Sequence, residues 1–222
     1  MSRQEVETLA EDVPTGKTCQ AMMTLARDRD MFLIFGLAER SASRVYNSAA
    51  IVGPRGFVGI YRKTHLFAEE KLCFDPGDTG FRVFDLGPAR IGVMICFDWI
   101  FPESARVLAI LGADVICHPA NLVLSHCQVA MRTRSIENSV FSLTANRIGT
   151  EFRGGKNPLR FTGNSQILDS EGNTIAGMGD EGPGVVIVDI DPREARDKRI
   201  TARNDRMKDR RPDFYRPLMD QP

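Results

Sequence analysis

Residues 91–120 place the strongest constraint on the fold, because they pass from strand-like sequence to helix-like sequence and back again. "IGVMI" is a continuous apolar run, and "ADVICHP" is a second one. Between them "PESARVLAILG" has proline in its first turn and glycine at its end, as helices commonly do. Continuous apolar runs are typical of strands covered on both faces. This stretch therefore predicts an α/β fold.

The rest of the chain continues the pattern. Helices are expected at 15–30, with Thr18 as the N-cap, and at 128–138. The apolar run 31–39 predicts a strand covered on both faces. Further strands are expected in "VYNSAAIV", "FVGIYR", "FRVFDL", "VFSLTAN", "NSQILD", "NTIAGM" and "GVVIVDID". Without internal repeats or low-complexity segments, we expect one domain over 1–200 and a basic C-terminal tail over 201–222.

Composition narrows the classes of partner and compartment. The 222 residues include 29 Lys and Arg against 29 Asp and Glu, so no net charge favours nucleic acid or an anionic membrane. No apolar run is long enough to span a membrane, and the start "MSRQEVETLAEDVP" has no apolar leader region. Five cysteines in no framework spacing suit reduced thiols. These features predict a cytoplasmic protein that binds neither nucleic acid nor membrane.

Cys96 is the first candidate for chemistry. It follows the strand "IGVMI", and helix signals begin at Pro102, so the thiol lies in or near a strand-to-helix turn. In such a turn a nucleophile stands clear of the sheet and the neighbouring N–H groups can hold an oxyanion. A thiol of ordinary pKa needs a cation or base beside it to react at neutral pH. Position alone leaves a structural cysteine equally possible.

Lys63 is the second candidate, at the end of the strand in "YRKTHLF". A lysine that ends a buried strand can place its ammonium in a cleft, where it lowers the pKa of a thiol. Taken alone, a surface lysine is the simpler interpretation. His65 is expected to be a hydrogen-bonding scaffold residue. Glu69 and Glu70, in the following loop, suit solvated acids.

No metal or organic cofactor is expected. Cys117, His118, His126 and Cys127 resemble zinc ligands in type, but adjacent strand residues point to opposite faces and the pairs lack zinc-site spacing. The chain has neither a dinucleotide-binding glycine turn nor a phosphate-binding loop. No cysteine lies at C-x-x-C spacing from Cys96, which argues against a redox-sensing thiol protein.

Taken together, the motifs resemble one family. "YRKTHLF…EEKLCFDPGD", "GVMICFDWIFPESARVLAILGADVICHPAN", "RTRSIENSVFSLTANRIG" and "FTGNSQILDSEGN" are similar in order and spacing to the nitrilase, or carbon–nitrogen hydrolase, superfamily. The cysteine motif looks closest to the branch that reads "CFDW-x-FPE". The resemblance covers essentially the whole chain.

The resemblance implies an α-β-β-α sandwich that hydrolyses a non-peptide C–N bond in a small amide, carbamoyl compound or nitrile. It assigns Cys96 as the nucleophile that forms a thioester, and Lys63 as the oxyanion and proton partner. It gives the backbone N–H of Phe97 to the oxyanion, and Glu70 to the pocket beside the lysine.

Other residues receive lesser roles by the same resemblance. Asn121 edges the pocket, and Trp99 is close enough in sequence to shape it, although core packing explains an aromatic residue equally well. Arg134, in the "R-x-I-E-N" helix, supports the site. A homodimer or higher homo-oligomer is implied, and we expect the basic tail to contact the second subunit.

One part of the family pattern has no counterpart here. The family's general-base glutamate lies on an early strand, after a first strand and helix, and all three precede the segment that matches "SRQEVETLAEDVPTG". We therefore expect a fold that lacks the first strand-helix-strand, and a chain of poor stability. Two functional interpretations follow: an active hydrolase whose base lies on a segment outside this sequence, or a catalytically dead relative kept for binding or assembly.

Overall fold

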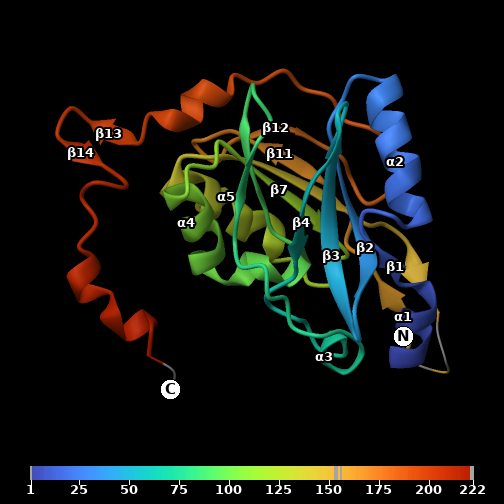
Figure 1. Ribbon diagram of the computed structural model, residues 1–222. Helices are drawn as coiled ribbons and strands as arrows, with labels where there is room; N and C mark the ends of the chain where they lie inside the picture. The colour runs from blue at the N-terminus through green and yellow to red at the C-terminus, as the bar shows by residue number, and fades with distance from the viewer. Residues whose placement is uncertain (1, 153–154, 156, 221–222) are drawn as a thin grey trace.

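The computed structural model describes residues 2–152, 155 and 157–220. Two large β-sheets form the centre (Figure 1). The first has the order β1-β2-β3-β4 and comprises β1 (Glu11–Asp12), β2 (Leu33–Ser41), β3 (Arg44–Gly53) and β4 (Gly56–Arg62). The second has the order β12-β11-β8-β7-β6-β5 and comprises β5 (Val83–Asp85), β6 (Arg90–Val93), β7 (Val115–Ala120), β8 (Phe141–Asn146), β11 (Gln166–Leu168) and β12 (Thr174–Gly177).

The remaining elements are helices and short hairpins. The α-helices are α1 (Arg3–Leu9), α2 (Lys17–Asp28), α3 (Glu70–Cys73), α4 (Pro102–Ile110) and α5 (Cys127–Asn138). The 3-10 helices are η1 (Cys96–Ile100), η2 (Pro192–Arg196), η3 (Pro212–Phe214) and η4 (Arg216–Leu218). Two-stranded ribbons pair β9 (Thr150–Glu151) with β10 (Leu159–Arg160), and β13 (Arg199–Thr201) with β14 (Asn204–Asp205).

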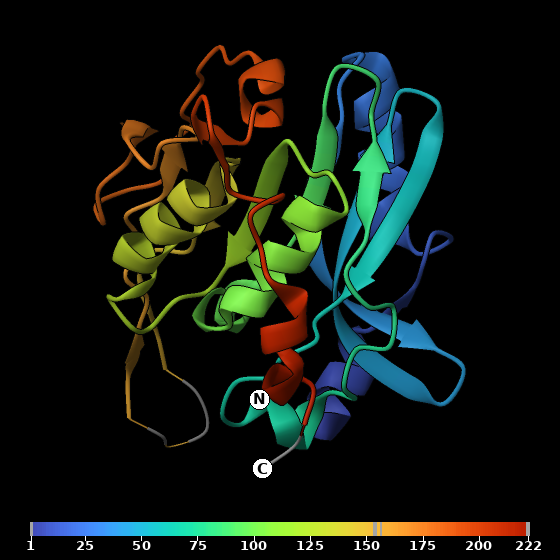
Figure 2. The same ribbon diagram turned by 90° about the vertical axis from the view of Figure 1, so that its left-hand side faces the viewer.

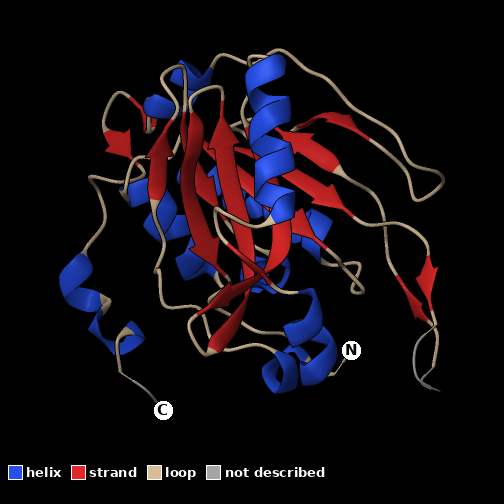
Figure 3. Cartoon of the chain, turned by 45° about the vertical axis from the view of Figure 1, so that its right-hand side comes forward, coloured by secondary structure: helices blue, strands red, loops and turns tan. Residues whose placement is uncertain are grey.

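The layers run helix, sheet, sheet, helix. Helix α2 packs on β3 and β4 at one side, as Figure 3 shows. Helices α4 and α5 pack against β6, β8 and β11 at the other side. The two sheets meet through contacts between β2 and β7. The mixed α/β fold predicted from the 91–120 pattern is therefore present, and β6, α4 and β7 form its strand-helix-strand unit with the two strands parallel.

Two apolar cores support these layers. Between the sheets, Ile51 and Tyr61 of the first sheet pack with Val93, Val115 and Phe141 of the second. Beneath α4 and α5, the second core contains Met94, Leu108, Ile116 and Met131 (all fully buried) together with Trp99. Cys96 packs against both cores, so the turn that carries it lies where the two packing layers meet.

The start of α2 differs from the prediction. Gly16 is the N-cap, and Thr18 lies inside the first turn. The Thr18 backbone N–H and hydroxyl both donate to the carboxylate of Glu11, at 2.8 Å each. The prediction of Thr18 as N-cap was wrong. Glu11, seven residues earlier, accepts from an N-terminal N–H of the helix, a role that the prediction gave to a local hydroxyl.

Two strand predictions also differ. Residues 184–191, "GVVIVDID", form no strand, and Val185 and Ile187 are 84% and 87% exposed. Strand β2 forms, but most of its residues are only partly buried, so it is not covered on both faces. Strand β1 pairs with β2 only at Glu39 and Arg40, so the outer edge of β2 over 33–38 has no neighbouring strand among the described residues. Residues 184–191 likewise have no ladder partner in the described part of the chain, and apolar content alone does not make a strand.

The C-terminal segment extends past the second helical layer. Figure 2 shows it running past α4, where Arg106 of that helix contacts the sulfur of Met207. Farther along, Phe214 and Leu218 are 68% and 66% exposed. Among the described residues, no helix is long and apolar enough to cross a membrane.

Candidate active site

Cys96 begins η1, in the strained turn that follows β6. Its φ is +44°, a left-handed conformation that a non-glycine residue adopts only when its surroundings hold it there. It is also the first residue of η1, where backbone N–H groups have no partner within the helix. The expectation that the thiol lies at a strand-to-helix turn is confirmed.

His118 of β7 holds this turn from one side. Its ring is completely buried, and Nε2 donates to the carbonyl oxygen of Cys96 at 2.8 Å. Because a carbonyl can only accept, the proton is on Nε2, and Nδ1 accepts from the hydroxyl of Thr144 at 3.2 Å. Burial lowers the pKa of His118, which keeps the ring neutral in this role.

Lys63 follows β4 directly and is 1% exposed, which excludes the surface interpretation. Its backbone N–H donates to the carbonyl of Asn47, which continues the pairing of β3 with β4 by one residue. Its Nζ donates to Oε2 of Glu70 at 2.5 Å. A buried ammonium requires such a partner, and Glu70 supplies it.

Glu70 is held by three donors and is not a solvated acid. Besides Lys63, the backbone N–H of Phe67 donates to Oε2 at 2.7 Å, and Nδ2 of Asn47 donates to Oε1 at 3.0 Å. Asn47 thus contacts both the lysine backbone and the carboxylate that pairs with the lysine. Its side chain fixes Glu70 relative to β3.

The thiol of Cys96 experiences opposing influences. Burial raises its pKa most, while the positive charge of Lys63 lowers it. The backbone N–H groups of Asn121 and Phe97 hydrogen-bond to the sulfur and lower the pKa further, and the charge of Glu70 raises it. The net pKa lies above the ordinary thiol value. The site therefore favours a thiol that reacts when a base takes its proton, with Lys63 and two N–H groups ready to stabilise negative charge.

The other four cysteines lie in different settings, and none of the five is disulfide-bonded. Burial raises the pKa of Cys117 to about 12 and raises those of Cys19 and Cys127. Cys19, Cys73 and Cys127 are buried. For Cys19, Cys117 and Cys127, no lysine charge stands among the causes that shift the pKa.

The residues named from the sequence do not all gather at the thiol. Four of them act on the Cys96 thiol. Lys63 and Glu70, which pair with each other, act through their charges, and Phe97 and Asn121 act through their backbone N–H groups. Trp99 instead packs in the core with Leu108, and its carbonyl accepts from Nε of Arg134 at 3.3 Å. Arg134 therefore supports η1 from α5.

Sequence reasoning missed Asn47 and Asp98, and treated His118 only as a possible zinc ligand. His118 and Thr144 belong to neighbouring parallel strands and are direct register partners, so only the sheet pairing reveals their contact. Asp98 stands inside the quoted cysteine motif, which is the one signal that could have identified it. Within the described part of the chain, no cluster of three or more His, Cys, Asp or Glu side chains could hold a metal ion.

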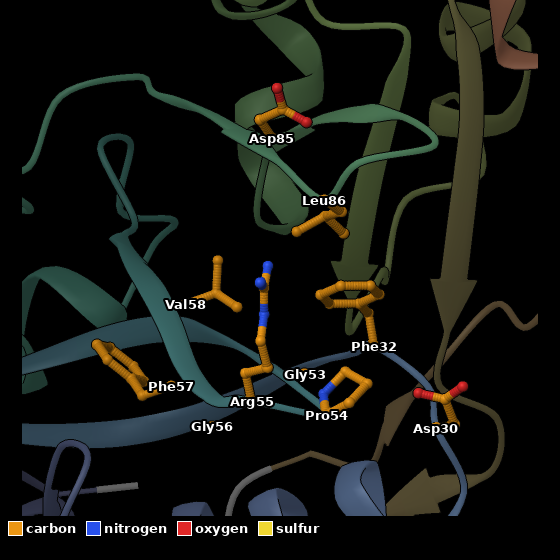
Figure 4. A pocket seen from close by; sticks show the side chains of 10 residues that line it. All are labelled: Asp30, Phe32, Gly53, Pro54, Arg55, Gly56, Phe57, Val58, Asp85 and Leu86. Carbon is orange, nitrogen blue, oxygen red and sulfur yellow. The ribbon is translucent and has the colours of Figure 1, made fainter.

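A cavity of ≈ 470 Å³ lies at the far end of β4 from Lys63, around the β3–β4 turn. Arg55 projects into it beside Phe32, with Asp30 and Asp85 at its margin (Figure 4). The lining residues include none of those described around Cys96. This cavity is separate from the candidate active site.

Comparison with known proteins defines the class. Residues 1–200 match the carbon–nitrogen hydrolase family. The chain is 49% identical to a nitrilase of Pyrococcus abyssi over 96% of this chain and 80% of that protein. It is 33% identical to an N-carbamoylputrescine amidase of Solanum lycopersicum, over 95% of this chain and 75% of that protein. The chain therefore belongs to the carbon–nitrogen hydrolase family.

Comparison with solved structures gives the same class of protein. A carbon–nitrogen hydrolase from Helicobacter pylori G27 superposes with a TM-score of 0.83 at 26% identity, covering 90% of this chain and 75% of that one. A mutant amidase from Nesterenkonia sp. AN1, with acrylamide added at its active site cysteine, gives 0.76 at 26% identity, covering 98% and 78%. The prediction of a hydrolase of the nitrilase and amidase type, working through a cysteine, is confirmed.

Proposed function

We propose that Cys96 is the nucleophile of this hydrolase, with Lys63 as its oxyanion and proton partner. The observation that carries this proposal is the environment of one sulfur: a strained turn, a lysine charge, and the N–H groups of Phe97 and Asn121. Glu70 holds the lysine and orients substrate or water. These are the components that attack on a carbonyl or nitrile carbon needs.

The reaction on an amide has two stages. The sulfur of Cys96 bonds to the carbonyl carbon as a base takes the thiol proton, and the oxygen becomes an anion stabilised by Lys63 and the N–H of Phe97. The C–N bond then breaks, ammonia or an amine leaves with a proton, and a thioester remains. Water attacks that thioester, releasing the carboxylic acid and returning the thiol. One donor to the oxyanion is worth about 3–4 kcal/mol of barrier.

The substrate is proposed to be a small amide or carbamoyl compound, with a nitrile as the alternative. Relatives support both classes: N-carbamoylputrescine amidases of tomato and potato, an (R)-stereoselective amidase of Pseudomonas sp., and the nitrilase of Pyrococcus abyssi. Lys63 and the N–H groups would stabilise negative charge on the carbonyl oxygen, which amide and carbamoyl groups share. The choice of substrate depends on the rest of the pocket.

We also propose that the fold is an α-β-β-α sandwich of the nitrilase type, which the helix-sheet-sheet-helix layering supports. We further propose a domain over 1–200, a tail over 201–222 that contacts a second subunit, and a homodimer or larger homo-oligomer.

An ammonia-release screen tests the function. The protein is incubated with a panel of small amides, carbamoyl amines and nitriles, beside Cys96→Ala and the control Cys117→Ala. We expect release from at least one class, abolished by Cys96→Ala and kept by Cys117→Ala. Release that survives Cys96→Ala would contradict the proposal. An absence of release from every class, with Cys96 still open to alkylation, would favour the binding or assembly role.

A further inference from the structure

Asp98 is a completely buried carboxylate two residues after Cys96. Its Oδ2 accepts from the hydroxyl of Tyr61 and from the backbone N–H of Ile95, both at 2.8 Å. Its Oδ1 lies 2.8 Å from Nδ1 of His65 and accepts from the His65 backbone N–H at 3.1 Å. A carboxylate that is removed from water to this degree depends on all of these donors.

These donors come from the two segments that carry the candidate catalytic pair. Tyr61 and His65 stand two residues before and two residues after Lys63, and Ile95 directly precedes Cys96. One side chain therefore ties both flanks of the lysine to the near flank of the cysteine. The segments come from different sheets, and β4 has no backbone ladder to β6 or η1.

The histidine adds a second, apolar connection. Its ring stacks on Phe101 at 3.8 Å between centroids, and Phe101 ends the turn on its far side. His65 is thus fixed between the carboxylate of Asp98 and the ring of Phe101. One contact lies inside η1 and the other at its end, so the lysine segment is attached at two points to the turn that presents the thiol.

From this geometry, and resting on the proposed function, we infer that Asp98 is a positioning residue that sets the separation between the Lys63 ammonium and the Cys96 thiol. The attraction between an ammonium and a thiolate depends directly on their distance. Loosening either segment would weaken the influence of Lys63 on the thiol. Asp98 touches neither substrate nor sulfur in this role, and acts through Lys63.

A double-mutant cycle tests this, using the rate at which iodoacetamide alkylates Cys96 between pH 6 and 10. In that reaction the thiolate sulfur bonds to the methylene carbon as iodide leaves, so the rate reports the thiolate population without needing a substrate. The variants are Asp98→Asn, Lys63→Met and their combination, with the modified cysteine identified by peptide mass. Asp114→Asn is the matched control, because Asp114 is 1% exposed and pairs with Arg90 and Arg196 instead.

We expect Asp98→Asn to slow alkylation at pH 7 roughly threefold to tenfold and to move the pH profile upward. In the Lys63→Met background it should change the rate less than about twofold, because the charge it positions is gone. Asp114→Asn should leave the profile unchanged. Equal factors in both backgrounds would overturn the inference and make Asp98 a fold-stabilising residue only.

One further variant, and the result of Lys63→Met alone, keep the test decisive. If Asp98→Asn does not fold, Tyr61→Phe removes one donor to the same carboxylate and should give a smaller shift with the same dependence on Lys63. An unchanged profile in a folded Tyr61→Phe would count against the inference. If Lys63→Met alone leaves alkylation unchanged, lysine and thiol are not coupled, and the inference falls together with the assigned role of Lys63. Failure of ammonia release alone would affect only the proposed function.

Discussion

The turn 95–101 and the segment 184–190 show opposite relations between local sequence and structure. The turn contains a non-glycine residue in a left-handed conformation, yet Asp98, His118 and Arg134 hold its backbone through hydrogen bonds. The segment "GVVIVDI" is composed mainly of residues with high strand propensity, yet it forms no strand and exposes Val185. Contacts with residues distant in sequence thus hold the turn, whereas high strand propensity alone does not make 184–190 a strand.

The difference has a physical basis. A strand needs a neighbour for its N–H and C=O groups, and propensity supplies only a small part of its stability. A strained turn persists where its surroundings over-determine it, and such turns are common at functional sites. The turn has partners from β4, β7 and α5, whereas 184–190 has no ladder partner in the described part of the chain.

The largest effect is expected from Lys63→Met. It removes the charge beside Glu70 and one oxyanion donor, so kcat should fall by about 10²–10³-fold with a smaller change in KM. Steady-state kinetics on whichever substrate releases ammonia measures this. Arg55→Met, at the separate cavity beyond the other end of β4, is the matched control. Unchanged kcat in Lys63→Met would remove the lysine from the mechanism.

A second experiment compares the interior with the exposed segment. Ile51 is fully buried between the sheets, so Ile51→Ala should reduce the free energy of unfolding by about 2–5 kcal/mol. Ile187→Ala should change it by less than about 0.5 kcal/mol, because that side chain is already 87% exposed. Urea unfolding measures both. A large loss for Ile187→Ala would show that 184–190 is packed in solution.

Among the described residues, the outer edge of β2 over 33–38 also has no neighbouring strand. Edges of this kind and exposed apolar strand formers promote self-association. Ile187→Lys should therefore reduce the apparent mass measured by light scattering after gel filtration if 184–190 takes part. An unchanged mass distribution would place any association elsewhere, for example at the tail.

A fourth experiment compares thiols. Burial raises the pKa of both Cys96 and Cys117, to about 12 for Cys117, but only at Cys96 do Lys63 and two N–H groups oppose it. Under native conditions Cys96 should therefore be alkylated at least about tenfold faster than Cys117. Time-resolved peptide mapping gives all five rates. Equal rates in the folded protein would contradict an activated thiol at Cys96.

Much of this arrangement could be predicted from the sequence. The β6–α4–β7 unit followed from apolar runs with proline and glycine at the helix ends. Their places at the ends of strands made Cys96 and Lys63 candidates only, and the family resemblance gave each its expected role. His118 could not be assigned, because its role depends on the register between β7 and β8. Segment 184–191 was predicted wrongly, since its apolar content indicates a strand but says nothing about whether a neighbour is present.

The smallest effect is expected at Lys198, two residues after η2. Its Nζ donates to the carbonyls of Asn138 and Ser139 at the end of α5, at 3.0 and 2.8 Å. Burial lowers its pKa to about 8, against an ordinary value of 10.5, although the charge of Asp114 opposes this. Between these two values the unfolded chain holds a proton that the folded chain has released, so stability should rise with pH over that window.

The measurement is urea unfolding at pH 7.5 and pH 10, with Lys198→Met as the reference. The unfolding midpoint of the unmodified protein should rise relative to that of Lys198→Met as pH increases, because the penalty for burying the ammonium is fully present below pH 8 and is relieved above it. Other groups that titrate in this range are common to both proteins and cancel in the difference. A pH-independent difference would mean that Lys198 keeps an ordinary pKa, and that its contact with the end of α5 is open to solvent like segment 184–190.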